Sequence, residues 1–145
     1  MVLLDTSCMV ALVCPWHEHH RQTVASLDAR LDCGAKLLLA APALVEAYAV
    51  LTRLPAPFRM PAASARELLR ANFGKLSTIA LAAGDYWRLL DRAPGEGVLG
   101  GRTYDAIIAA CARKGKAGEL MTLNLGHFEQ FAGEGLRVVS PAVAR

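Results

Sequence analysis

The stretch Val2-Leu3-Leu4-Asp5-Thr6-Ser7 is an apolar run that stops at a carboxylate and continues into two hydroxyl-bearing residues. A short continuous apolar run is typical of a strand that is buried on both faces, as in a parallel sheet. Asp, Thr and Ser before the next apolar stretch are typical of a helix start. The stretch therefore predicts a strand that leads directly into a helix, with a charged group at the junction.

Short apolar runs alternate with helical patterns along the rest of the chain. We expect strands at residues 1–4, 36–40, 78–81, 119–122 and 136–140. We expect helices at residues 7–13, 16–31, 42–53, 61–73, 84–92, 103–114 and 125–132. This alternation predicts an α/β fold with a parallel sheet that helices cover on both faces. The length of 145 residues suits a single domain spanning residues 1–145.

Composition narrows the class of protein. Hydrophobic residues make up 54% of the chain, which excludes a disordered protein. The apolar start ends at Asp5, and no run approaches the roughly 20 apolar residues that span a bilayer, so a cytoplasmic protein is expected.

The four cysteines lack C-x-x-C spacing, which indicates reduced thiols. A net charge of +3 only mildly favours a polyanionic partner.

Three carboxylates lie in otherwise apolar segments: Asp5, Glu46 and Asp105. A charge near an apolar interior costs several kcal/mol unless it is paired, protonated or bound to a cation. Ligands of parallel sheets collect outside the carboxyl ends of the strands. Asp5 follows the first strand, Glu46 lies one turn into the helix after the second, and Asp105 opens the helix before the fourth. We therefore expect an acidic cluster that holds a divalent metal ion, which is typical of phosphate chemistry.

Each acid also has a purely structural interpretation. Asp5 could cap the following helix, worth about 1 kcal/mol, although capping and metal binding can use different oxygens. Asp105 could serve merely to complement the dipole of its helix. However, apolar residues at i+3, i+4 and i+7 from Asp105 form a stripe and indicate that this face of the helix points inward. The stripe consists of Ile108, Ala109 and Ala112. The Glu46 helix has no charged face, so we expect Glu46 to lie on an inward face shared with Ala43, Ala49 and Val50.

The segment Cys14 to His20 contains a second group of metal-binding residue types. Cys14, His17 and His20 have helical spacing, but no second pair of ligands follows downstream. We therefore interpret the histidines as exposed residues at the start of a helix rather than as a zinc site.

Four motifs carry a resemblance to a known family. They are Leu3-Leu-Asp-Thr-Ser7, Pro42-Ala-Leu-Val-Glu-Ala47, Gly100-Gly-Arg-Thr-Tyr-Asp-Ala-Ile-Ile-Ala109 and Thr122-Leu-Asn-Leu-Gly-His-Phe128. In this order they resemble the motifs of PIN-domain ribonucleases, in particular VapC-type toxins of bacterial toxin–antitoxin pairs. The resemblance extends from residue 3 to the final strand, and Asp5, Glu46 and Asp105 match the family's three main acids.

The resemblance implies a three-layer α/β/α sandwich with a central, mostly parallel sheet. It also implies a Mg²⁺ or Mn²⁺ ion and endonucleolytic cleavage of RNA such as transfer or ribosomal RNA. A homodimer and inhibition by a cognate antitoxin protein are further expectations. Asp5, Glu46 and Asp105 are then both the catalytic residues and the metal ligands.

The chain departs from this pattern where the family often has a fourth acid. Asn124 and His127 occupy the two candidate positions, so one metal ion is expected rather than two. Asn124 could bond to metal-bound water or simply cap the last helix. Thr6 and Ser7 could support the metal or phosphate, or cap the backbone. Arg102 is expected to contact RNA phosphate, or to pair with an acid.

The favoured reaction is hydrolysis of RNA phosphodiester bonds by water. A metal ion on Asp5 and Asp105 would activate the water, with Glu46 as a further ligand or as the base that orients it. One alternative is an α/β phosphohydrolase with Asp5 as covalent nucleophile, but such enzymes usually have a second acid where this chain has Ser7. Another alternative is a non-catalytic module of the same fold that binds RNA or protein.

Overall fold

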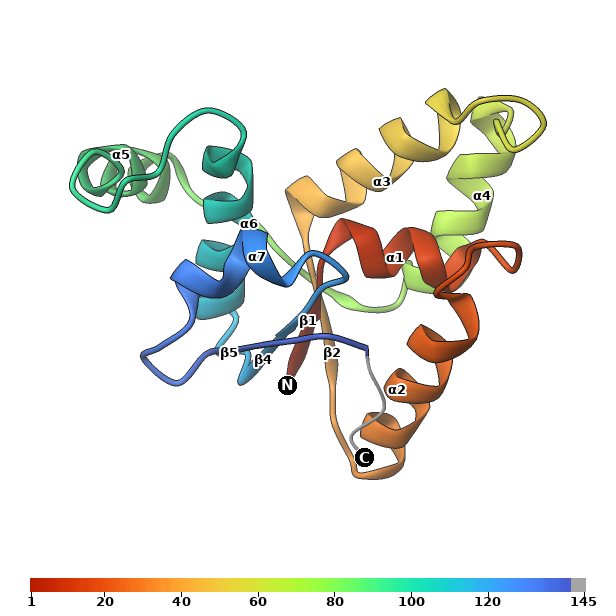
Figure 1. Cartoon of the computed structure of the whole chain (residues 1–145), viewed down its shortest axis with the longest axis horizontal. Coiled ribbons are helices and arrows are strands. Elements are labelled where there is room, and N and C mark those ends of the chain that lie inside the picture. The colour runs from red at the N-terminus through yellow and green to blue at the C-terminus, as the bar shows by residue number, and fades with distance from the viewer. Residues whose placement is uncertain (142–145) are drawn as a thin grey trace.

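The computed structural model describes residues 1–141 (Figure 1). The strands are β1 (Val2–Leu4), β2 (Leu37–Ala40), β3 (Ser77–Ile79), β4 (Glu119–Met121) and β5 (Arg137–Val139). The helices are α1 (Thr6–Val13), α2 (His20–Asp32), α3 (Ala41–Arg53), α4 (Ala62–Phe73), α5 (Ala83–Arg92), α6 (Arg102–Lys114) and α7 (Leu125–Phe128), with a 3-10 helix η1 (Glu129–Phe131) after α7. Each predicted strand and helix is present, with shifted ends.

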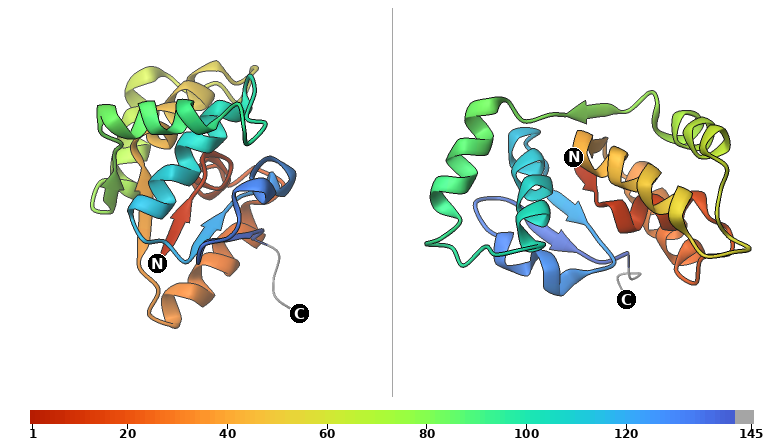
Figure 2. Two further views of the ribbon diagram at one scale, coloured as in Figure 1. Left: turned by 90° about the vertical axis from the view of Figure 1, so that its left-hand side faces the viewer. Right: turned by 90° about the horizontal axis from the view of Figure 1, so that it is seen from above.

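The five strands form one sheet in the order β3-β2-β1-β4-β5, and each neighbouring pair is parallel. The central strand is β1, where Leu3 pairs with Leu38 on one side and with Leu120 on the other. Helices α1 to α4 lie to one side of the sheet and α5 to α7 to the other (Figures 1 and 2). The predicted α/β sandwich with a parallel central sheet is confirmed.

The middle of the sheet is fully apolar. The side chains of Leu3, Leu4, Leu39, Leu120 and Met121 are completely buried. Burial of each such side chain is worth about 1.5–3 kcal/mol, which explains why strands this short are stable. Strand β1 contains no polar residue, and polar residues directly follow β1 (Asp5) and β4 (Thr122) at the carboxyl edge of the sheet.

The second helix begins later than the sequence predicts. The predicted helix starts at Trp16, whereas α2 starts at His20. The intervening residues form turns, in which the His19 N–H donates to Nδ1 of His17 at 3.1 Å. Trp16 stacks on Phe58 with ring centroids 4.2 Å apart. This contact with a residue 42 positions away (58 minus 16) holds Trp16 outside the helix, and no local pattern could have indicated it.

The cysteines are free, as predicted: Cys8, Cys14 and Cys111 are buried and Cys33 is exposed. Burial raises the pKa of the Cys8 thiol far above its ordinary value, and it raises the pKa of Cys111 to about 11. These thiols are therefore protonated packing groups. Within residues 1–141, every helix is too short or too polar to cross a membrane.

Candidate active site

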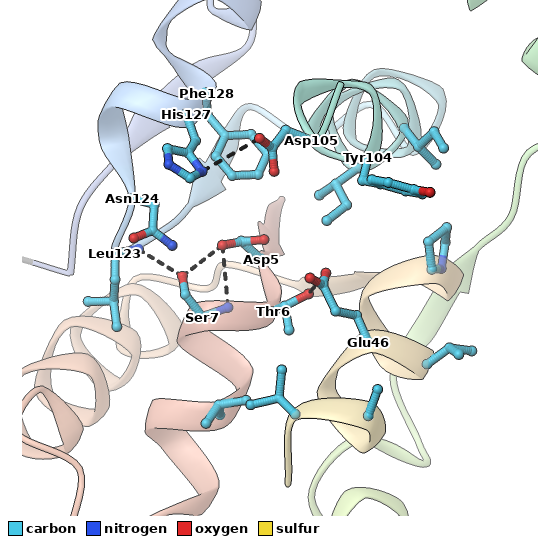
Figure 3. A pocket seen from close by; sticks show the side chains of 18 of the residues that line it. Asp5, Thr6, Ser7, Glu46, Tyr104, Asp105, Leu123, Asn124, His127 and Phe128 are labelled. Carbon is cyan, nitrogen blue, oxygen red and sulfur yellow. Dashed lines mark hydrogen bonds and ion pairs between the residues drawn. The ribbon is translucent and has the colours of Figure 1, made fainter. Parts of the chain in front are cut away.

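A cleft of about 1390 Å³ opens at the carboxyl edge of the sheet. Its walls come from α1, α3, α6, α7 and the segment that joins β4 to α7 (Figure 3). Asp5, Glu46 and Asp105 all line this cleft, and their carboxyl groups point toward one another. The structure thus brings together acids that lie up to 100 residues apart in the sequence (105 minus 5).

Asp5 is held in a fixed orientation at the start of α1. The residue is 4% exposed, and its Oδ2 accepts hydrogen bonds from Ser7 Oγ at 2.7 Å and from Thr122 Oγ1 at 2.9 Å. The Ser7 N–H also donates to Oδ2 at 3.3 Å, which caps the helix. Oδ1 accepts no hydrogen bond from residues 1–141, yet it is not sealed from solvent. Capping by one oxygen therefore leaves the other available to a ligand in the cleft.

The backbone after β4 positions the two hydroxyls that bind Asp5. Ser7 Oγ accepts from the Leu123 N–H at 3.0 Å, and Thr122 Oγ1 accepts from the Asn124 N–H at 3.0 Å. No role for Thr122 was predicted from the sequence. A polar residue at the end of a buried strand was the available signal, but the pairing of β1 with β4 was needed to place it beside Asp5.

Glu46 faces the cleft from α3, and Thr6 Oγ1 donates to its Oε2 at 2.7 Å. The prediction that Glu46 lies on a buried face with Ala49 is wrong, because both residues are exposed. The buried stripe of α3 consists of Ala43, Ala47 and Leu51. These residues repeat at i, i+4 and i+8, so Glu46 is rotated away from the core and toward the cleft.

Asp105 lies in the first turn of α6, above the predicted stripe of Ile108, Ala109 and Ala112, which is buried. Its side chain is 20% exposed, and Oδ2 is 3.6 Å from Nδ1 of His127. Partial burial raises the pKa of the Asp105 carboxyl above its ordinary value. The neighbouring carboxylates of Asp5 and Glu46 raise this pKa further, whereas His127 and Arg102 oppose the increase. The three acids therefore repel one another across the cleft.

Two supporting residues have unexpected contacts. Arg102 Nη1 donates to the Gly126 carbonyl at 2.8 Å, which ties the start of α7 to α6. Asn124 occupies the N-cap position of α7, but its side chain makes no capping hydrogen bond. The interpretation of Asn124 as a side-chain cap is therefore wrong, and the residue lines the cleft instead.

The donor chemistry of the cleft fits a hard divalent cation. Three carboxylates supply oxygen ligands, and a positive ion would relieve their mutual repulsion. Within residues 1–141, no three His, Cys, Asp or Glu side chains are already close enough to hold a metal ion together. Each acid instead has a polar partner of its own: Ser7 and Thr122 bind Asp5, Thr6 binds Glu46, and His127 faces Asp105.

The segment from Cys14 to His20 gives no zinc site. The Cys14 side chain is buried, and Nδ1 of His20 lies 2.8 Å from the Ala11 carbonyl oxygen. His17 and His19 instead line the cleft that contains the acids.

Comparison with known proteins gives a consistent family assignment. Residues 2–134 match the family model of the PIN domain. Ribonuclease VapC40 of Mycobacterium tuberculosis (strain CDC 1551 / Oshkosh) is 38% identical over 138 residues, which cover 95% of this chain and 96% of that protein. Ribonuclease VapC27 of Mycobacterium tuberculosis (strain ATCC 25618 / H37Rv) is 30% identical over 140 residues, 96% of each chain.

A solved structure shares the fold over nearly the whole chain. The structure of VapBC2 from Rickettsia felis, bound to a DNA fragment from its promoter, matches with a TM-score of 0.70 and 18% identity. The match covers 97% of this chain and 98% of that chain.

Proposed function

This chain belongs to the PIN domain family, and from that premise we propose that it is a metal-dependent endoribonuclease that acts as the toxin of a toxin–antitoxin pair. The observation that carries the proposal is the convergence of Asp5, Glu46 and Asp105 on one cleft. Relatives that match almost the whole chain are ribonucleases, which supports RNA as the substrate. Transfer or ribosomal RNA is the expected class of RNA.

Asp5 Oδ1 and the carboxylates of Asp105 and Glu46 would hold a Mg²⁺ or Mn²⁺ ion. Such an ion lowers the pKa of bound water and neutralises charge on the phosphate oxygens. Hydrogen bonds from Ser7 and Thr122 keep Asp5 in one orientation, which reduces the reorganisation needed when substrate binds.

Glu46 is the residue best suited to orient the attacking water and accept its proton. It is exposed to the cleft, and the Thr6 hydroxyl fixes one of its oxygens while the other stays accessible. Arg102 is proposed to contact an RNA phosphate from the same rim of the cleft. The covalent phosphohydrolase alternative needs a proton donor at position 7, but the Ser7 hydroxyl already donates to Asp5 itself.

Exposed apolar side chains support a homodimer. Trp87 and Leu90 on α5, Leu99 before α6 and Tyr104 on α6 are 68%, 48%, 74% and 70% exposed. Helix α5 protrudes from the body of the molecule (Figure 1). A second copy of the chain that packs on these side chains would remove them from water, which is favourable. We also propose that a cognate antitoxin binds this chain and covers the acidic cleft; the existence of such a partner is supported by the Rickettsia felis structure of the same fold, which is a VapBC complex.

The test of the proposed function is to express the wild type and Asp105→Asn in a bacterium and to map the ends of cellular RNA. We expect slowed growth and new RNA ends with the wild type only. Asp28→Asn is the matched control, because it removes an exposed acid from α2 and should cut like the wild type. Identical RNA ends for wild type and Asp105→Asn, or cleavage by purified protein that survives a chelator, would contradict the proposal.

Thr6→Val is expected to slow RNA cleavage by about tenfold with little change in stability. The substitution preserves the shape of a side chain that is 6% exposed, but it removes the hydroxyl that donates to Glu46. Loss of such a supporting hydrogen bond typically reduces activity or metal affinity by about 10–100-fold. Thr6→Ser keeps the hydroxyl and should retain most of the activity. Cleavage rates on one RNA measure the effect, and equal rates for Thr6→Val and wild type would exclude a role for this hydrogen bond.

A further inference from the structure

His127 faces Asp105 across the cleft, and its chemistry differs from that of the other residues around the acids. Its Nδ1 lies 3.6 Å from Oδ2 of Asp105. The imidazole is 57% exposed and lines the same cleft as the three carboxylates (Figure 3). His127 therefore offers a nitrogen atom as a metal ligand, beside carboxylates that offer oxygen atoms.

The position of His127 is determined by the residues on either side of it. The Gly126 carbonyl accepts a hydrogen bond from Arg102 on α6 at 2.8 Å. The next residue, Phe128, is 1% exposed and packs in the core. The His127 N–H itself donates to the Asn124 carbonyl at 2.9 Å. The backbone of α7 is thus fastened to α6, which carries Asp105, so the approach of the two side chains follows from the fold.

A salt bridge between His127 and Asp105 would contribute too little stability to explain why the two side chains lie together. An ion pair with an exposed partner contributes roughly 0–1 kcal/mol to stability. The distance between Nδ1 of His127 and Oδ2 of Asp105 instead suits two atoms that bind the same ion. Two ligand atoms that each lie about 2.1 Å from an ion, at right angles to each other, are about 3 Å apart. The observed 3.6 Å is close to that spacing.

We propose that His127 is a direct ligand of the metal ion that Asp105 helps to bind, and that the site therefore prefers Mn²⁺ to Mg²⁺. Imidazole nitrogen suits transition-metal ions, whereas Mg²⁺ favours carboxylate, carbonyl and water oxygens. An imidazole at this position also adds no negative charge to the three carboxylates of the cleft. This inference rests on the proposed function in one respect only, namely that Asp105 is a metal ligand.

The first experiment measures the affinities of the purified chain for Mn²⁺ and Mg²⁺ by calorimetry, without RNA. The variant His127→Asp replaces the nitrogen donor with an oxygen donor at an exposed position, where substitutions rarely disturb folding. We expect the ratio of Mn²⁺ to Mg²⁺ affinity to fall by about tenfold or more in His127→Asp. His19→Asn is the matched control, because His19 lines the same cleft and should leave the ratio unchanged. An unchanged ratio in His127→Asp would overturn the inference.

The second experiment identifies the ligand directly by pulsed electron paramagnetic resonance of bound Mn²⁺. A coordinated imidazole should give nitrogen modulation in the wild type and in His19→Asn, but none in His127→Asp. If Mn²⁺ binds, is lost in Asp105→Asn and shows no nitrogen modulation in the wild type, His127 is not a ligand and the proposed function still stands. If Asp105→Asn binds Mn²⁺ as the wild type does, the metal lies elsewhere and both proposals fail.

Discussion

Asp5→Asn is expected to lower the rate of RNA cleavage by about 10³-fold while the protein stays folded. Asparagine keeps one carbonyl oxygen, which can still accept from the Ser7 N–H and from the hydroxyls of Ser7 and Thr122. The capping of α1 is therefore preserved, and only the negative charge toward the cleft is lost. Removal of a group that stabilises charge in the transition state typically costs a factor of 10²–10³, and loss of a metal ligand costs at least as much.

Single-turnover cleavage of one defined RNA, with enzyme in excess, is the appropriate measurement because it isolates the chemical step. Asp28→Asn serves as the control, since it removes the same charge from an exposed position on α2. A melting temperature close to that of the wild type would show that Asp5→Asn is folded. A cleavage rate within threefold of the wild type would exclude Asp5 as a catalytic group.

The sequence was sufficient to place the acids on the correct edge of the sheet. Val2–Leu4 is apolar throughout, so a buried parallel strand was the natural prediction, and Asp5 directly follows it. The stripe below Asp105 has helical spacing, so its burial could be predicted from residue types alone. Both inferences depend only on residues within two helical turns of the acid concerned.

The contacts between elements could not be predicted in this way. Glu46 depends on how α3 is rotated about its axis, and Ala43, Ala49 and Val50 are all small or apolar, so the sequence did not reveal which of them faces the core. The hydrogen bond from Thr122 to Asp5 joins residues 117 positions apart and depends on the register of β1 with β4. Tertiary packing decides such details, and a periodic pattern carries no information about it.

Asp105→Asn is expected to stabilise the metal-free protein at neutral pH even though it abolishes cleavage. Burial raises the pKa of the Asp105 carboxyl in the folded state, and the charges of Asp5 and Glu46 raise it further. The folded protein therefore binds this proton more tightly than the unfolded chain, whose aspartates titrate near 3.9. The stability from this group is fully present below that ordinary pKa and is lost as the pH rises through the raised folded value. At pH 7 the ionised carboxylate thus opposes folding, and asparagine removes that effect.

Thermal unfolding in the presence of a chelator measures this effect. At pH 7 the melting temperature of Asp105→Asn should be a few degrees above that of the wild type. The difference should shrink as the pH falls through the raised pKa of the Asp105 carboxyl, because the wild-type carboxyl then becomes protonated and uncharged. Added Mn²⁺ should reverse the order at pH 7: an ion at a hundredfold excess over its Kd stabilises the folded state by about 2.7 kcal/mol. Only the wild type keeps the carboxylate needed for that gain. Equal stabilisation of both proteins by Mn²⁺, or a less stable variant at pH 7 in chelator, would mean that the three acids do not form one electrostatically strained metal site.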